Sequence, residues 1–342
     1  MNLEELLFYA VESKASDLHL SAGLRPQIRV DGDLCPLNQP VLQHEELLKM
    51  LYNLMNNKQH KDYEEQHEID FSFEISKLAR FRVNVFKQAR GAGAVFRILP
   101  PKIPQLTDLP AIFRELASYP KGLILVTGPT GSGKTTTLAA MIDYINEIYH
   151  KHILTIEDPL EYIHDSKNCL ITQREIHRDT QSFNSALRAA LREDPDVILI
   201  GELRDQESIR LAMTAAETGH LVLASLHTNS ATKTINRIIE VFKGEERSVI
   251  RSLLSESLQA VVAQVLLKKT GGGRQLAFEV MICNTAIRHL IREDKINQMY
   301  STIQTGQAQG MQTLDQHLVQ LVQNNQISSA VAYEVAVNKT LF

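Results

Sequence analysis

One segment of the sequence has the residue types and the spacing of a phosphate-binding loop. Residues 128–135 read GPTGSGKT and match the pattern G-x-x-x-x-G-K-[ST] in full. The segment follows an apolar run at 123–126 and precedes a stretch at 136–144 that is typical of a helix. Glycines let backbone N–H groups approach phosphate oxygens without a Cβ in the way, and the helix start adds a positive dipole end. This order of strand, loop and helix predicts a nucleotide site.

Two side chains of this loop have distinct expected roles. Lys134 is expected to reach the β- and γ-phosphates, and Thr135 is expected to bind Mg²⁺. The full set expected to bind the nucleotide is Gly128, Pro129, Thr130, Gly131, Ser132, Gly133, Lys134, Thr135 and Thr136.

Carboxylates follow two other apolar runs. Residues 196–202 read DVILIGE, and an acid in the place of Glu202 can reach the Mg²⁺ shell beside a phosphate loop. Residues 155–161 read TIEDPLE and bring three carboxylates, including Glu157 and Glu161, close together after a strand. Like charges so close repel, and a cation would relieve the repulsion. An exposed acidic turn is the alternative interpretation of this second segment.

Two histidines and three arginines are further candidates. His220 and His227 flank one apolar run. A neutral imidazole can donate to a γ-phosphate, although two histidines can equally cap a strand. Arg82 and Arg97 are out of phase with the apolar residues of their predicted strands, and Arg90 lies between those strands. Their spacing favours solvent exposure; the alternative is an arginine that stabilises phosphate charge in a neighbouring subunit.

The elements that must position these residues fall into two parts. Residues 1–99 show short alternating patterns and amphipathic stretches, with helices near 3–10 and 47–55 and an antiparallel hairpin over 81–99. A proline cluster then predicts a linker at 100–119. From 120 onward, unbroken apolar runs alternate with helical stretches, which favours a parallel sheet buried on both faces. Past residue 271 the chain is expected to be mainly helical.

Composition limits the function classes. The 342 residues suit about two domains, and the net charge of −4 gives no electrostatic basis for nucleic-acid binding. No apolar run approaches the length of a membrane span, and the acidic start is unlike a secretory signal. The three cysteines lie far apart, which excludes a disulfide framework and a local zinc cluster. These features predict a cytoplasmic protein.

Four motifs together resemble the secretion ATPase family, which powers type II and type IV secretion and type IV pili. Segments 128–135, 155–161, 196–202 and 220–227 look like its Walker A, Asp box, Walker B and His box. Three further segments are similar to the pilus-retraction members of this family: SDLHL at 16–20, FRVN at 81–84 and AIRHLIRE at 286–293. The similarity covers the chain nearly from end to end. His289 stands where those members usually have Asn.

The resemblance implies an α/β fold in two domains. A PAS-like α+β domain would cover 1–99, followed by the linker at 100–119. A RecA-like P-loop ATPase domain would cover 120–270, and its helical C-terminal part 271–342. The implied protein is a homohexamer that hydrolyses ATP with Mg²⁺ and drives retraction, by depolymerisation, of type IV pili in twitching motility.

The implied partners are a platform protein of the inner membrane, bound from the cytoplasm, and an accessory retraction ATPase. Nucleic acid and membrane insertion are not expected. An accessory retraction paralogue is the first alternative function. An assembly or type II secretion motor is the second, although such relatives usually carry a longer N-terminal extension and a four-cysteine metal site. A nucleic-acid motor and a non-enzymatic regulator complete the alternatives; the regulator would need a defective site.

The resemblance also implies roles at the site. Glu161 would activate the attacking water, with Glu157 as the second candidate, and Glu202 with Thr135 would support Mg²⁺, partly through water. The histidines would link the phosphate state to the domain interface, and some of the arginines would approach the nucleotide. These residues are His220, His227, Arg82, Arg90 and Arg97.

Overall fold

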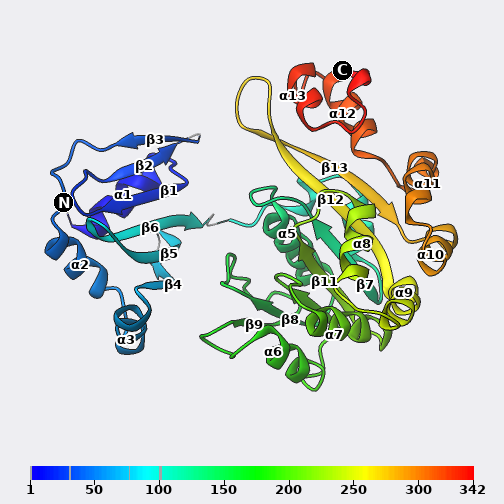
Figure 1. Cartoon of the computed structure of the whole chain (residues 1–342), viewed down its shortest axis with the longest axis horizontal. Helices are drawn as coiled ribbons and strands as arrows, with labels where there is room; N and C mark the ends of the chain where they lie inside the picture. The colour runs from blue at the N-terminus through cyan, green and yellow to red at the C-terminus, as the bar shows by residue number, and fades with distance from the viewer. Residues whose placement is uncertain (1, 31, 77, 100–101) are drawn as a thin grey trace. The chain divides into compact units, whose positions relative to one another are not determined.

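The computed structural model describes residues 2–30, 32–76, 78–99 and 102–342 (Figure 1). The chain divides into two compact units. The first comprises Met1–Lys102 and Pro159–Ile163, and the second comprises Ile103–Asp158 and His164–Phe342. No helix of the described residues combines the length and the apolar character that a membrane crossing requires.

The first unit is built on a six-stranded antiparallel sheet with strand order β3-β2-β1-β6-β5-β4. The strands are β1 (Asp17–Ser21), β2 (Gln27–Val30), β3 (Asp33–Pro36), β4 (Glu68–Ile75), β5 (Ala79–Gln88) and β6 (Gly91–Leu99). The helices are α1 (Leu3–Glu12), α2 (His44–Tyr52) and α3 (Asn57–Gln66).

Alternation along the strands gives this sheet one apolar face and one polar face. Phe81, Val83 and Val85 of β5 are fully buried and share one core cluster with the apolar residues of α1 and α2. Helix α1 begins with a capping box in which the side chains of Asn2 and Glu5 satisfy each other's backbone N–H groups. The predicted hairpin is present as β5 and β6, whereas α3, which buries Tyr63 as its one buried side chain, was not predicted.

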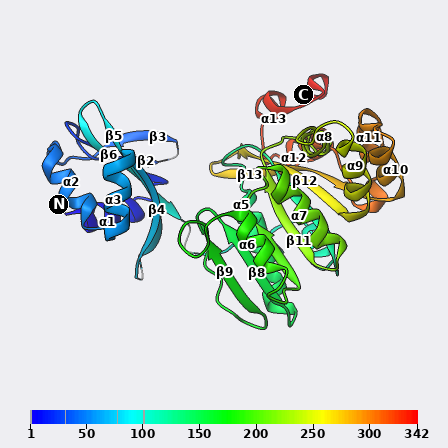
Figure 2. The same ribbon diagram turned by 60° about the horizontal axis from the view of Figure 1, so that its bottom comes forward.

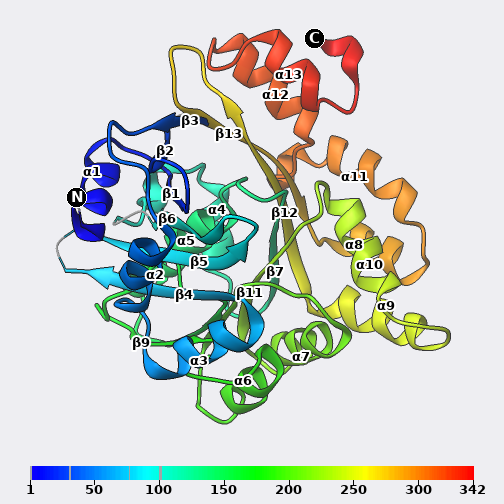
Figure 3. The same ribbon diagram turned by 60° about the vertical axis from the view of Figure 1, so that its left-hand side comes forward.

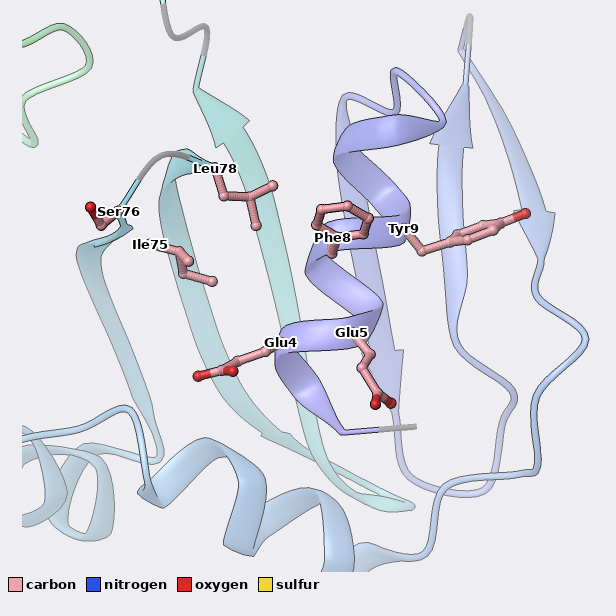
Figure 4. A pocket seen from close by; sticks show the side chains of 7 residues that line it. All are labelled: Glu4, Glu5, Phe8, Tyr9, Ile75, Ser76 and Leu78. Carbon is pink, nitrogen blue, oxygen red and sulfur yellow. The ribbon is translucent and has the colours of Figure 1, made fainter.

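An open groove of about 630 Å³ lies on this unit between the outer face of α1 and the ends of β4 and β5 (Figure 4). Apolar side chains of Phe8, Tyr9, Ile75 and Leu78 line much of it. It contains none of the residues predicted to bind nucleotide.

The second unit is built on a seven-stranded sheet with order β13-β12-β7-β11-β10-β8-β9. Six strands run parallel and β13 is antiparallel to β12. The strands are β7 (Gly122–Thr127), β8 (His152–Glu157), β9 (Leu170–Glu175), β10 (Val197–Ile200), β11 (Leu221–Leu226), β12 (Leu258–Lys268) and β13 (Arg274–Ile282).

Helices cover both faces of this sheet, as unbroken apolar strands require (Figures 1 and 2). Ile124 and Val126 of β7 pack with α4 and α5, whereas Leu123 and Leu125 face the core that holds α6 to α11. The helices are α4 (Ile112–Ala117), α5 (Lys134–Ile148), α6 (Phe183–Ala190), α7 (Gln206–Glu217), α8 (Ala231–Glu240), α9 (Glu246–Ser257), α10 (Thr285–Arg292) and α11 (Met299–Thr305).

A separate small core holds α12 (Leu314–Gln323) and α13 (Ser329–Val335) against β12 and β13 (Figure 3). Four short 3-10 turns complete the chain: η1 (Leu106–Asp108), η2 (Ile296–Gln298), η3 (Gln307–Gln309) and η4 (Lys339–Leu341).

Two segments differ from the sequence expectation. The predicted linker at 100–119 contains η1 and α4, and Leu106, Phe113 and Leu116 are buried in the second unit. Pro100 and Pro101 lie outside the described residues. The segment after residue 271 begins with β13 before it becomes helical. In the first segment prolines give a local signal typical of loops, yet the apolar residues between them pack into the core of the second unit.

Candidate functional site

The phosphate loop connects the end of β7 to the start of α5, in the order that its sequence pattern predicts. Gly128 has φ +146°, and a Cβ there would lie 2.2 Å from the carbonyl oxygen of Gln264 on β12. Gly133 precedes the helix with φ +87°, in the left-handed region. Side chains at these two positions would disrupt the loop, so its backbone conformation requires glycine there.

The side chain of Lys134 is held by hydrogen bonds to the backbone of its own loop. Its Nζ donates to the carbonyl oxygens of Gly128 (2.9 Å) and Pro129 (3.1 Å), and its residue is 9% exposed. Its Nζ also lies 3.5 Å from His227 Nδ1. The ammonium is thus fixed at the mouth of the loop, next to the end of β11.

A polar chain continues from His227 along the same edge of the sheet. His227 Nε2 lies 3.0 Å from Glu202 Oε1, so the neutral tautomer that donates from Nε2 lets Nδ1 accept from Lys134. Arg204 Nε donates to Glu202 Oε2 (2.9 Å), and its Nη1 lies 3.7 Å from Asp158 Oδ2. The structure therefore joins Lys134, His227 and Glu202, which sequence reasoning selected separately. Arg204 was missed.

The acids of residues 155–161 divide between the two units. Glu157 ends β8 and is 6% exposed, and a Cβ on Gly201 would lie 3.3 Å from its Cα. Register pairs Ile200 with Ile156, so Glu157 and Glu202 lie at the carboxyl ends of neighbouring strands. Glu161 belongs to the first unit and is partly buried.

His220 does not lie with His227. It precedes β11, its Nδ1 is 2.9 Å from the carbonyl oxygen of Ala215, and its backbone oxygen accepts from Gly122 at the start of β7. The six residues of β11 separate the two histidines by about 20 Å. His220 therefore contacts the C-terminal end of α7, at the amino ends of the strands. The structure does not bring it to the phosphate loop.

The three arginines lie in the first unit. Arg82 and Arg97 are register partners on the polar face of its sheet. Arg82 pairs with Asp70 (3.2 Å) and Arg97 with the buried carboxylate of Asp17 (3.0 Å). Arg90 is exposed in the turn between β5 and β6.

Gln264 is a site residue that sequence reasoning missed. It is 3% exposed; its Nε2 donates to the Ser132 carbonyl oxygen (2.8 Å), and its Oε1 accepts from Thr137 Oγ1 (3.1 Å). One amide therefore fastens β12 both to the loop and to α5. The available signal was an amide in the middle of an apolar strand.

The loop fits a bound polyphosphate. The buried Ser132 Oγ has no hydrogen-bond partner among the described residues. The N-terminus of the 15-residue α5 and the Lys134 ammonium supply positive potential beside it. Thr135 and Thr136 are partly exposed at the same helix start, and oxygens of Thr135 and Glu202 are of the kind that Mg²⁺ prefers.

Comparison with known proteins gives one family. A model described as "Type II/IV secretion system protein" matches residues 2–338. The chain is 59% identical to "Type IV pilus retractation ATPase PilT" of Pseudomonas aeruginosa, over 98% of each chain. It is 40% identical to "Type IV pilus ATPase PilU" of the same organism, over 96% of this chain and 87% of that one. Among solved structures, that of the pilus retraction motor PilT with bound ADP has a TM-score of 0.92, with 46% identity and coverage of 100% and 99%.

Proposed function

The chain belongs to the family of type II/IV secretion system proteins, and from this premise we propose that it works as a homohexameric motor at the base of the pilus machine. It is an ATPase that powers retraction of type IV pili and so twitching motility. Its fold is α/β, with a PAS-like N-terminal domain and a RecA-like ATPase domain. The predictions of the fold class, of ATPase activity and of pilus retraction are confirmed.

The observation that carries the proposal is the chain of contacts from Lys134 through His227 to Glu202. Lys134 and the loop N–H groups bind and orient the β- and γ-phosphates of ATP. Thr135 and Glu202 would hold Mg²⁺, partly through water; when bound, that ion neutralises charge on the phosphate oxygens. The glycines and Gln264 keep this arrangement in place before substrate arrives.

Water activation is the step for which the acid box supplies two candidates. Glu161 is our assignment for the carboxylate that accepts the proton of the attacking water, and Glu157 is the second candidate. His227 contacts both Lys134 and Glu202, which suits it to respond when the γ-phosphate leaves. Loss of that charge loosens the groups around it, a common origin of conformational switching.

Mechanical coupling follows from such a switch in an assembly of six. Arg82, Arg90 or Arg97 would approach the nucleotide of an adjoining subunit, and the platform protein of the inner membrane would receive the motion. The chain is 59% identical to the retraction ATPase and 40% identical to the second pilus ATPase, which favours the retraction motor.

ATP turnover of the purified protein beside Lys134→Ala and Glu161→Ala tests the proposal. We expect the parent to hydrolyse ATP as a hexamer and both variants to assemble but to lose at least about 100-fold in kcat. Lys268→Ala, at the exposed end of β12, is the matched lysine control and should keep parental turnover. A hexameric parent that binds ATP and never hydrolyses it with Mg²⁺ present would instead favour a regulator.

A further inference from the structure

A buried carboxylate on β13 lies at the N-termini of two helices. Glu279 is 4% exposed, and its Oε1 accepts from the backbone N–H of Ala231 at 2.7 Å. Ala231 is the first residue of α8. The backbone N–H of Leu314, the first residue of α12, also acts on this carboxylate and lowers its pKa. This side chain thus holds the start of α8 by a hydrogen bond and lies near the start of α12.

Neither helix needs this carboxylate as its N-cap. The side chain of Ser230 already caps α8 by accepting from Lys233 N, and Thr313 caps α12 by accepting from Gln316 N. Burial raises the pKa of Glu279, because desolvation disfavours its charged form, and the two helix N–H groups oppose that shift. Burial of a carboxylate costs free energy, and the helices already have N-caps. The geometry therefore points to a role of Glu279 in positioning the residues around it.

The position that Glu279 controls is that of His227. Residues 227–230 lead from the end of β11 to the start of α8, so the loop has little freedom once both ends are held. The first turn of α8 is also held on its other side. Thr234 Oγ1 is 2.7 Å from Thr228 Oγ1 and 3.5 Å from Oγ1 of Thr127, which directly precedes the phosphate loop.

We propose that Glu279 is a positioning residue for ATP hydrolysis, which holds the start of α8 and thereby His227 against Lys134 and Glu202. The inference rests on the proposed function, because it assigns His227 a part in turnover. Glu279 itself contacts neither the loop nor the residues that bind phosphate in the described structure.

The test compares Glu279→Gln with Asp315→Asn. Asp315 is a second buried carboxylate, on α12, and it accepts from the backbone N–H groups of Val337 and Asn338. Among the described residues it has no hydrogen bond to α8. We expect Glu279→Gln to lower kcat about tenfold while KM for ATP changes less than about threefold, because Lys134 and the loop still bind the phosphates. Its thermal midpoint at pH 8 should be unchanged or higher, since a buried charge is removed. Asp315→Asn should keep kcat within about twofold of the parent.

A second background isolates the route through His227. In a His227→Ala protein, Glu279→Gln should cause less than about a twofold further change in kcat, because the residue it positions is gone. An equal tenfold loss in both backgrounds would overturn the proposal, as would equal losses for Asp315→Asn. If Glu279→Gln does not fold, Glu279→Asp decides, because a carboxylate one methylene shorter should also lower kcat. A parent without ATPase activity would refute the proposed function; an active parent matched by Glu279→Gln would refute this inference alone.

Discussion

At the scale of single residues, the site depends on which histidine reaches the phosphate loop. His227 is at the carboxyl end of β11, where its two ring nitrogens contact Lys134 and Glu202. His220 is at the amino end, where it contacts the last turn of α7. Ligands of open α/β sheets bind beyond the carboxyl ends of the strands, so we expect His227, and not His220, to take part in ATP hydrolysis.

This difference predicts opposite effects for the same substitution. We expect His227→Asn to lower kcat by about 10- to 100-fold with a small effect on stability, because its side chain is half exposed. His220→Asn should keep kcat within about twofold and should lower the free energy of unfolding by about 1 kcal/mol through its contact with Ala215. Steady-state kinetics and chemical denaturation of both variants check this. If His220→Asn lost more kcat than His227→Asn, a place at the carboxyl ends of the strands would not decide which histidine takes part in hydrolysis.

At the scale of elements, β12 acts as the support of the phosphate loop. It runs parallel to β7, and Gln264 from its middle reaches both Ser132 and Thr137. The loop is therefore anchored to a strand about 130 residues further along the chain. The two sheet neighbours of the loop strand, β11 and β12, thus supply His227 and Gln264.

Removal of this amide should weaken both the fold and nucleotide binding. Gln264→Leu has a similar volume but leaves the Ser132 carbonyl and the Thr137 hydroxyl buried without a partner. We expect a loss of about 1–3 kcal/mol in the free energy of unfolding and a rise in KM for ATP of several-fold. Gln275→Leu is the matched control, because its amide donates only to the neighbouring Leu276 carbonyl among the described contacts. Unchanged KM in Gln264→Leu would show that the loop holds its shape without β12.

At the scale of the whole molecule, stability should depend on two histidines that the fold keeps neutral. Desolvation lowers the pKa of His164 and of His317 to about 4. His317 Nδ1 accepts from the backbone N–H of Phe278, which joins α12 to β13. An unfolded chain binds protons at these residues below pH 6.5, whereas the folded chain does so only near pH 4. Their stabilising contribution is therefore complete above pH 6.5 and falls as the pH drops toward 4.

Proton binding to each of these histidines in the unfolded chain should lower the free energy of unfolding by about 2 kcal/mol between pH 7 and pH 5. We expect His317→Asn, which keeps an acceptor for the Phe278 N–H, to reduce the fall in thermal midpoint over that range. His177→Asn is the control, because His177 is exposed and has φ +67°, a conformation that Asn tolerates. The prediction is wrong if the two variants show the same dependence on pH.

The sequence by itself determined the phosphate loop, the family and the function, because these are carried by contiguous residues. The pattern of 128–135 and the apolar runs around it need no tertiary information, and the fold class follows from the same local periodicity. Predictions of Lys134 at the loop and of Glu202 after its strand agree with the structure for this reason.

The tertiary structure alone decided which distant residues meet. The strand order places Gln264 and His227 at the loop and His220 at the amino ends of the strands. It also places Glu279 within hydrogen-bond distance of Ala231, which is 48 residues away in the sequence. Prolines indicated a linker at 100–119 and the chain past residue 271 was expected to be helical, yet packing placed α4 in the first segment and β13 in the second. Order and register depend on long-range contacts, which the local periodicity of a single chain does not specify.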